Sequence, residues 1–160
     1  MGGRRFLAVL AAVVTFLSAG QTIARECVSD YQAFSREAVE AGEYVKDRTP
    51  RDAVFVTGTQ HLNPVVAIAG RTVVCGPDLW LYWHGFDPTE RHSELHAFYE
   101  DPEGHPEVPE KYGAEYVYLS SYERNSYDVD LEGMDKVGVK IFENDEAAIY
   151  RLYAGREDAG

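Results

Sequence analysis

Residues 53–75 read AVFVTGTQHLNPVVAIAGRTVVC, and this stretch decides the fold. The apolar run at 53–57 is short and continuous, which is typical of strands buried on both faces. After a polar loop, Pro64 suits the first position of a short helix over 65–69, and a second β-branched strand spans 71–75. A strand, a loop, a helix and a strand in this order predict the start of a parallel α/β sheet.

Further elements extend this unit in both directions. Ser35 is a suitable N-cap for a helix that runs to Arg48 with one apolar face. A third strand is predicted at 116–119, and the runs 137–142 and 147–152 flank a turn and indicate a hairpin at the edge of the sheet. The fold class is therefore α/β: a small three-layer Rossmann-like sheet, mostly parallel, with a C-terminal antiparallel hairpin.

Two more segments lie between the second and third strands. Residues 87–90, DPTE, form a capping-box-like start for a helix that reaches about Tyr99. Residues 101–109 are rich in proline and acid and predict an exposed loop. A last helical turn comes next at 110–113 and ends on glycine.

The N-terminus is a targeting or membrane segment. A basic start precedes an uncharged, mostly apolar stretch at 6–23. This pattern fits a secretory signal peptide and fits equally well a transmembrane helix with its arginines in the cytoplasm. Residues 1–25 are thus a membrane or signal helix, and both interpretations place the rest of the chain outside the cytoplasm. The domain would be secreted if residues 1–24 are cleaved.

The remainder of the chain is one acidic domain. About 135 residues come after position 25, enough for a single core, which we assign to an extracytoplasmic α/β domain at 26–154 with a flexible tail at 155–160. They carry 12 basic and 27 acidic residues, a net charge of −15. Such a surface repels phosphate backbones and acidic lipids, so nucleic acid is not an expected partner.

The two cysteines leave two interpretations open. Cys27 and Cys75 would lie in an oxidising compartment, where a disulfide between them is an option. Alternatively, Cys75 follows a β-branched run and is a small buried apolar residue, with Cys27 close to the membrane.

Residues 75–87, CGPDLWLYWHGFD, contain both tryptophans of the protein. Trp80, Trp83 and His84 lie here beside carboxylates, after a predicted strand, where α/β domains usually present ligand contacts. Aromatic faces beside carboxylates and imidazole suit a saccharide. The alternative is that these rings cover one end of a small core.

Other polar residues come after the ends of the neighbouring strands. His61 and Asn63 lie in the loop after the first strand, and Arg124 follows the third strand. Because the carboxyl ends of parallel strands meet at one edge, we predict a pocket that joins these residues to the aromatic segment. No cofactor is expected.

Several short motifs together resemble a known family. They are RTP at 48–50, DAVFVT at 52–57, HLNPV at 61–65, AGR at 69–71, CG at 75–76, Trp80, HG at 84–85, Asp87 and KYGAEYV at 111–117. With a preceding membrane helix, this order resembles the extracytoplasmic C-terminal domain of polytopic prokaryotic membrane proteins similar to C-type-fold, mannosyltransferase-like glycosyltransferases that use lipid-linked sugars.

The resemblance implies a location and a role. Residues 6–23 would correspond to the final membrane helix, and the chain would bind or position a glycan or lipid-linked sugar, or contact a polytopic membrane protein. The acidic residues expected to catalyse glycosyl transfer lie in early loops of such enzymes, which have no counterpart here. The resemblance therefore assigns catalysis to no residue of this chain.

Two other function classes stay open. One is a structural or protein-interaction module of a membrane assembly. The other is a metal-dependent hydrolase, because His92 and His96 lie four residues apart near Glu94 and could share a helix face. A zinc protease motif needs glutamate directly after the first histidine, and Ser93 stands there, so two solvated histidines are favoured and no metal site is assigned.

Overall fold

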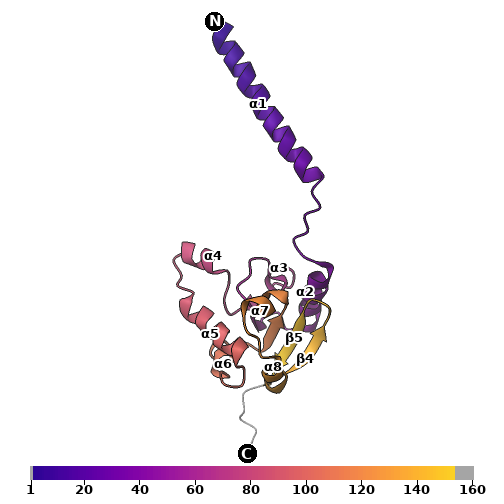
Figure 1. Ribbon diagram of the computed structural model, residues 1–160, viewed down its shortest axis with the longest axis vertical. Coiled ribbons are helices and arrows are strands. Elements are labelled where there is room, and N and C mark those ends of the chain that lie inside the picture. Colours follow the sequence, from indigo (N-terminus) through magenta and orange to yellow (C-terminus); the bar gives the residue numbers. More distant parts are fainter. Residues whose placement is uncertain (1, 154–160) are drawn as a thin grey trace, which may run out of the picture. The chain divides into compact units, whose positions relative to one another are not determined.

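The computed structural model describes residues 2–153 and divides between Ala33 and Phe34 into two units (Figure 1). The first unit contains α1 (Gly2–Cys27), in which every described residue is exposed. Within the described chain, α1 is the one helix long and apolar enough to cross a membrane, a test that signal sequences also pass. The predicted N-terminal apolar helix is confirmed, and the predicted tail at 155–160 lies outside the described residues.

The second unit is built on one five-stranded sheet. Its strands are β1 (Val54–Val56), β2 (Thr72–Val73), β3 (Tyr116–Leu119), β4 (Gly138–Glu143) and β5 (Ala148–Leu152), in the order β2-β1-β3-β5-β4. β1 pairs in parallel with β2 and with β3. β5 pairs antiparallel with β3 and with β4.

The sheet is therefore mixed, and the prediction of a mostly parallel sheet was wrong. The C-terminal hairpin joins the sheet through its second strand, so β5 lies between β3 and β4. This insertion gives two antiparallel pairs against two parallel pairs. The α/β class, the parallel start of the sheet and the C-terminal hairpin are confirmed.

Between Phe34 and Tyr153, the described part of the second unit contains seven helices. They are α2 (Arg36–Arg48), α3 (Pro64–Ala67), α4 (Asp78–Trp83), α5 (Thr89–Glu100), α6 (Glu107–Tyr112), α7 (Ser121–Ser126) and α8 (Leu131–Val137). The predicted cap of α2 is present, because Ser35 accepts a hydrogen bond from the amide of Ala38 at 2.9 Å.

The segment between the second and third strands differs from the prediction. Asp87 accepts a hydrogen bond from the Thr89 amide at 3.0 Å, but the residue next to α5 is Pro88, so no complete capping box forms. The predicted loop at 101–109 ends early because α6 begins at Glu107 and buries its Val108 and Pro109.

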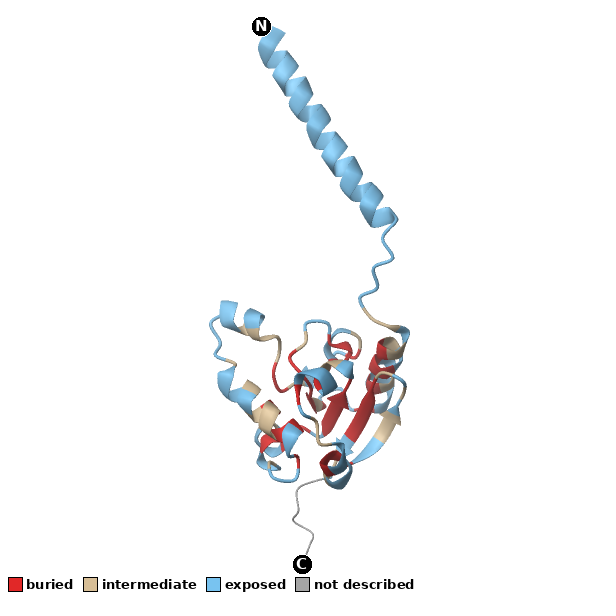
Figure 2. Ribbon diagram, in the orientation of Figure 1, coloured by how far each residue is buried: buried red, intermediate tan, exposed pale blue. Residues whose placement is uncertain are grey.

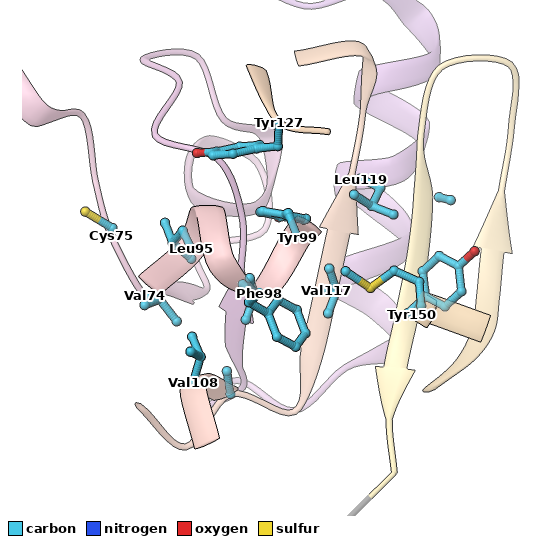
Figure 3. Close-up of a cluster of buried hydrophobic side chains, with 14 residues drawn as sticks. Val74, Cys75, Leu95, Phe98, Tyr99, Val108, Val117, Leu119, Tyr127 and Tyr150 are labelled. Atoms are coloured by element: carbon cyan, nitrogen blue, oxygen red, sulfur yellow. The ribbon is translucent and has the colours of Figure 1, made fainter. Parts of the chain in front are cut away.

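Helices cover both faces of the sheet, because side chains alternate along each strand. Val117 and Leu119 of β3 belong to a cluster with Phe98 and Tyr99 of α5 (Figure 3). Tyr118, on the opposite face of β3, belongs to the cluster that contains Ala41 and Val45 of α2. The core thus lies in two layers, one on each side of the strands.

Arg71 joins α2 to the β1–α3–β2 unit. Its buried guanidinium donates to the carbonyls of Lys46 at 2.8 Å, Thr49 at 3.0 Å and Ala69 at 2.7 Å. The first two carbonyls are at the C-terminal end of α2, where the helix dipole favours a cation. The buried guanidinium of Arg71 is therefore stabilised by hydrogen bonds to backbone carbonyls rather than by a carboxylate.

Candidate functional site

An open cleft of about 740 Å³ lies between α4 and α5. Asp78 of α4 and His92 of α5 stand at 3.3 Å, Oδ2 to Nδ1, and connect the two helices across it. The residues that line the cleft are Asp78, Leu79, Tyr82, Gly85, Phe86, Asp87, Pro88, Thr89 and His92. The cleft therefore combines aromatic rings with two carboxylates and an imidazole.

Only part of the cleft lining follows from the geometry of α4. Leu79 and Tyr82 are three residues apart and share one side of this helix, whereas Phe86 lies beyond its end, after Gly85 at φ +81°. Trp80, Trp83 and His84 are not among the lining residues. The sequence analysis selected these three; the spacing of Leu79 and Tyr82 was the local signal for the lining, and no helical spacing identifies Phe86.

α4 is the most exposed helix of the second unit and contains no buried residue (Figure 2). The side chain of Trp83 is 74% exposed and that of Tyr82 is 68% exposed. Leu81 alone is a partly buried residue of α4 that packs on the core. The alternative prediction, that these aromatic residues cover one end of the core, is therefore wrong for Trp83 and Tyr82.

Three of the predicted site residues lie together. The rings of His61 and Trp80 meet edge to face, with centroids 4.5 Å apart. Nδ1 of His84 lies 2.7 Å from the carbonyl oxygen of Trp80. The loop after β1 and the helix after β2 are thus in contact, as expected for the carboxyl ends of parallel neighbours.

Of the other three predicted residues, Trp83 is exposed, and Asn63 and Arg124 have partners of their own. Asn63 is buried and caps α3: its Oδ1 accepts from the Val65 amide at 2.9 Å, and its Nδ2 donates to Thr57 at 3.0 Å. Arg124 is exposed and donates to the carbonyl of Glu146 at 3.1 Å, in the β4–β5 turn. Ligand contacts by any of the predicted residues stay a prediction.

The loop after β3 reaches the loop after β1 through Glu123, not through Arg124. The Glu123 carboxyl is fully buried and accepts from the amides of Gly58 and Ser120, both at 2.8 Å. Burial raises the pKa of this carboxyl, against the effect of its hydrogen bonds. A Cβ at Gly58 would lie 2.6 Å from the ring of Tyr122, so this close approach requires glycine.

Sequence reasoning missed Glu123 although a signal was present. Ser120 and Glu123 form a complete capping box at the start of α7, with the serine and the acid three residues apart directly after a strand. Its role is structural, since it fixes the β1 loop against α7. That loop carries His61, so the buried carboxyl positions one member of the His61–Trp80 pair.

The histidines of α5 are neighbours, as predicted, with ring centroids 5.1 Å apart. Glu94, however, accepts hydrogen bonds from Lys111 at 2.7 Å and from Tyr112. These bonds contribute to lowering the pKa of Glu94, against its desolvation. Among residues 2–153, no group of three or more histidines, cysteines or carboxylates is placed to hold a metal ion.

The cysteines are free thiols in the structure, Cys27 exposed and Cys75 buried. Cys75 packs in the core cluster beside α5 (Figure 3), as the second interpretation predicts. Burial, with a smaller contribution from the charge of Asp78, raises the pKa of Cys75 to about 11. The thiol is therefore protonated at neutral pH and is a poor nucleophile.

No protein-family model matches the chain, and no curated protein sequence matches it significantly.

Proposed function

We propose that this chain is a membrane-anchored extracytoplasmic domain that binds or positions a saccharide or a lipid-linked sugar and is not catalytic by itself. It would act beside a polytopic, glycosyltransferase-like membrane protein. The observation that supports this function most is the open cleft of about 740 Å³ between α4 and α5, with its aromatic, carboxylate and imidazole lining. A cleft of this size accommodates a small ligand.

The lining suits the two kinds of surface that a sugar ring presents. The rings of Tyr82 and Phe86 offer apolar faces for the C–H face of a sugar. The carboxylates of Asp78 and Asp87 accept hydrogen bonds from hydroxyl groups. Hydrogen bonds from the side chain and the amide of Thr89 lower the pKa of Asp87, so this acceptor is ionised at neutral pH. Trp80 and His84 do not line the cleft; with His61 they form a second surface that a saccharide would contact instead.

The location follows from the N-terminus. α1 is apolar, and Arg4 and Arg5 precede its apolar stretch, which favours a cytoplasmic start and an extracytoplasmic second unit. The parallel half of the sheet, β2-β1-β3 with its β1–α3–β2 unit, supports the proposal of a Rossmann-like arrangement. Its carboxyl edge, where such sheets bind ligands, is the edge at which His61 meets Trp80.

The test uses the full chain in detergent micelles and three soluble probes: methyl α-mannoside, N-acetylglucosamine and an α-linked mannobiose. Saturation-transfer NMR detects contact, and calorimetry gives the dissociation constant. We expect at least one probe to bind, and Tyr82→Ala to weaken it about tenfold or more because a stacking ring is lost. Tyr153→Ala is the matched control, since Tyr153 is a similarly exposed tyrosine outside α4.

Two results would contradict saccharide binding in the cleft. One is that none of the probes binds at millimolar concentration. The other is binding that Tyr82→Ala leaves unchanged. If instead Trp80→Ala and His84→Ala weaken binding while Tyr82→Ala does not, the sugar binds the His61–Trp80 surface and the cleft is not the site.

A second function is a protein-interaction module of a membrane assembly. The observation that favours it is the exposure of Leu79, Trp83 and Phe86, which are large and apolar. Co-purification of the full chain with a polytopic membrane protein, lost in Trp83→Ala and without response to any sugar probe, would support this function over the first.

A further inference from the structure

The exposed side of α4 has the composition of a membrane-interface segment. Leu79, Tyr82, Trp83 and Phe86 are between 64% and 74% exposed, and we call these four side chains the α4 apolar surface. Residues 76–86 contain no lysine or arginine and a single carboxylate, Asp78. Tryptophan and tyrosine are enriched where a bilayer meets water, because each ring has an apolar body and a polar group.

The polypeptide from α1 enters the second unit near the carboxyl end of β3, which is also the end of the parallel strands that α4 follows. Ser35, just before α2, donates a hydrogen bond to the carboxylate of Glu146, and Asn144 donates to the carbonyl of Glu37 at 3.0 Å. The β4–β5 turn, which holds both partners, lies beside the carboxyl end of β3, since Leu119 pairs with Ala148.

The carboxyl end of β1 lies at this same edge because β1 and β3 are parallel. The loop after β1 carries His61, which contacts Trp80 of α4 at 4.5 Å between ring centroids. Within the second unit, the start of α2 and helix α4 accordingly lie toward the same end (Figure 1). The attachment point of the anchor and the α4 apolar surface thus lie at the carboxyl end of the parallel strands, the first beside the β4–β5 turn and the second after β2, on opposite sides of the sheet.

The connection to the anchor is short. Eight residues, 28–35, separate the last residue of α1 from the first residue of α2. A fully extended chain spans at most about 3.6 Å per residue, so this connection reaches roughly 29 Å. The start of α2 therefore stays within this distance of the last residue of α1.

We propose that α4 is a second membrane contact: the α4 apolar surface lies in the interfacial region of the bilayer in which α1 is anchored. The lipid is neutral or zwitterionic, because a net charge of −15 after position 25 opposes contact with anionic lipid. Leu79, Tyr82 and Phe86 also line the cleft, so this contact holds the opening of the cleft at the lipid surface, and lipid and a sugar would compete for these three side chains. The contact rests on the membrane anchor of the proposed function, but not on saccharide binding.

The test exploits the position of the tryptophans. The protein has two, Trp80 and Trp83, both in α4, so its tryptophan emission reports on this helix. The full chain, with α1 verified by mass spectrometry, is reconstituted into phosphatidylcholine vesicles with and without phosphatidylcholine brominated at defined depths of the acyl chain. We expect blue-shifted emission and at least twofold quenching by bromine near the headgroup end.

Single-tryptophan variants locate the contact. With Trp80→Phe, Trp83 is the sole reporter, and with Trp83→Phe, Trp80 is. We expect stronger quenching of Trp83, which is 74% exposed, than of Trp80, which is 57% exposed and contacts His61. Phe86→Asp should reduce the quenching, while the far-ultraviolet circular dichroism stays unchanged because Phe86 is not part of the core.

Two outcomes would overturn the second membrane contact. Emission at the wavelength of water-exposed tryptophan, insensitive to brominated lipid, would show that α4 stays in solvent. Blue-shifted emission that brominated lipid does not quench would show that protein, such as a second copy of this chain, covers the surface. Failure of all sugar probes in the cleft would leave the lipid result unaffected, so the two proposals can fail separately.

Discussion

The tyrosines of the sheet core and the aromatic residues of α4 have similar chemistry and opposite environments. Tyr99 and Tyr118 are at most 1% exposed, whereas Tyr82 is 68% exposed and Trp83 is 74% exposed. Tyr99 of α5 packs in the cluster on one face of β3, and Tyr118 of β3 is buried in the cluster on the opposite face. The comparison shows that aromatic residues stabilise the fold where helices pack on the sheet. On a helix with no buried residue, the same residue types are exposed to solvent and can contact ligands or lipid.

Glu123 provides the largest expected effect on the core side of this comparison. Glu123→Ala removes the acceptor of two buried amides, those of Gly58 and Ser120, and of the Ser120 hydroxyl. Each orphaned donor costs on the order of 1–3 kcal/mol, so we expect a loss of about 3 kcal/mol in the free energy of unfolding. Urea denaturation of the full chain in micelles measures it.

Glu132→Ala is the matched control for Glu123→Ala. Glu132 also lies in the first turn of a short helix, but its side chain is 85% exposed and its partner is Lys136. We expect a change within about 0.5 kcal/mol. Equal losses for the two variants would mean that the Glu123 carboxyl does not hold the β1 loop.

The same carboxyl predicts a pH dependence of stability. Burial raises the pKa of Glu123 in the folded state above its usual 4.5, so the folded protein binds this proton more tightly than the unfolded chain does. Its contribution to stability is complete below the ordinary pKa and declines as pH rises through the raised pKa.

Glu123→Gln isolates this contribution because glutamine does not titrate. The unfolding free energy of the unmodified protein minus that of Glu123→Gln should fall as pH rises from the ordinary pKa of 4.5 through the raised pKa of the folded state. Denaturation curves at several pH values measure the difference. A difference that grows with pH would indicate that the hydrogen bonds outweigh burial and that the pKa is lowered.

Two stacked tyrosines distinguish a satisfied hydroxyl from an unsatisfied one. The ring centroids of Tyr99 and Tyr127 are 4.7 Å apart. The Tyr99 hydroxyl donates a hydrogen bond to the Tyr118 carbonyl at 3.1 Å. The Tyr127 hydroxyl is buried and has no hydrogen-bond partner within the described part of the chain. We expect Tyr99→Phe to cost about 1 kcal/mol and Tyr127→Phe to be neutral or stabilising. Thermal denaturation of the two variants compares them, and a larger loss for Tyr127→Phe would reverse the assignment.

Trp83→Ala should have the smallest effect on stability. The side chain is mostly exposed, so we expect the free energy of unfolding to change by less than about 0.5 kcal/mol. Denaturation followed by circular dichroism measures this. A loss of stability as large as that of Glu123→Ala would mean that Trp83 packs against the domain. The α4 aromatic residues would then not be exposed, in contrast to the tyrosines of the core.

Sequence reasoning predicted the elements whose signals are local. The Ser35 cap of α2, the start of α3 at Pro64 and the limits of β3 are all confirmed. It missed α4 because six residues are too few to distinguish the spacing of a helix from a cluster of aromatic residues in a loop. It selected Trp80 and Trp83, but the cleft is lined by Asp78, Leu79 and Tyr82 of α4 together with residues 85–89 and His92.

The sequence by itself determined the apolar N-terminal helix, the capped helices and the α/β character, because caps and hydrophobic periodicity act within a few neighbouring residues. Only the tertiary structure decided that β5 pairs with β3, that Glu123 is buried against Gly58, and that α4 and α5 enclose a cleft. These depend on partners that lie far along the chain, for example 65 residues apart for Gly58 and Glu123. Such partners are selected by the packing of the whole domain, not by the local sequence.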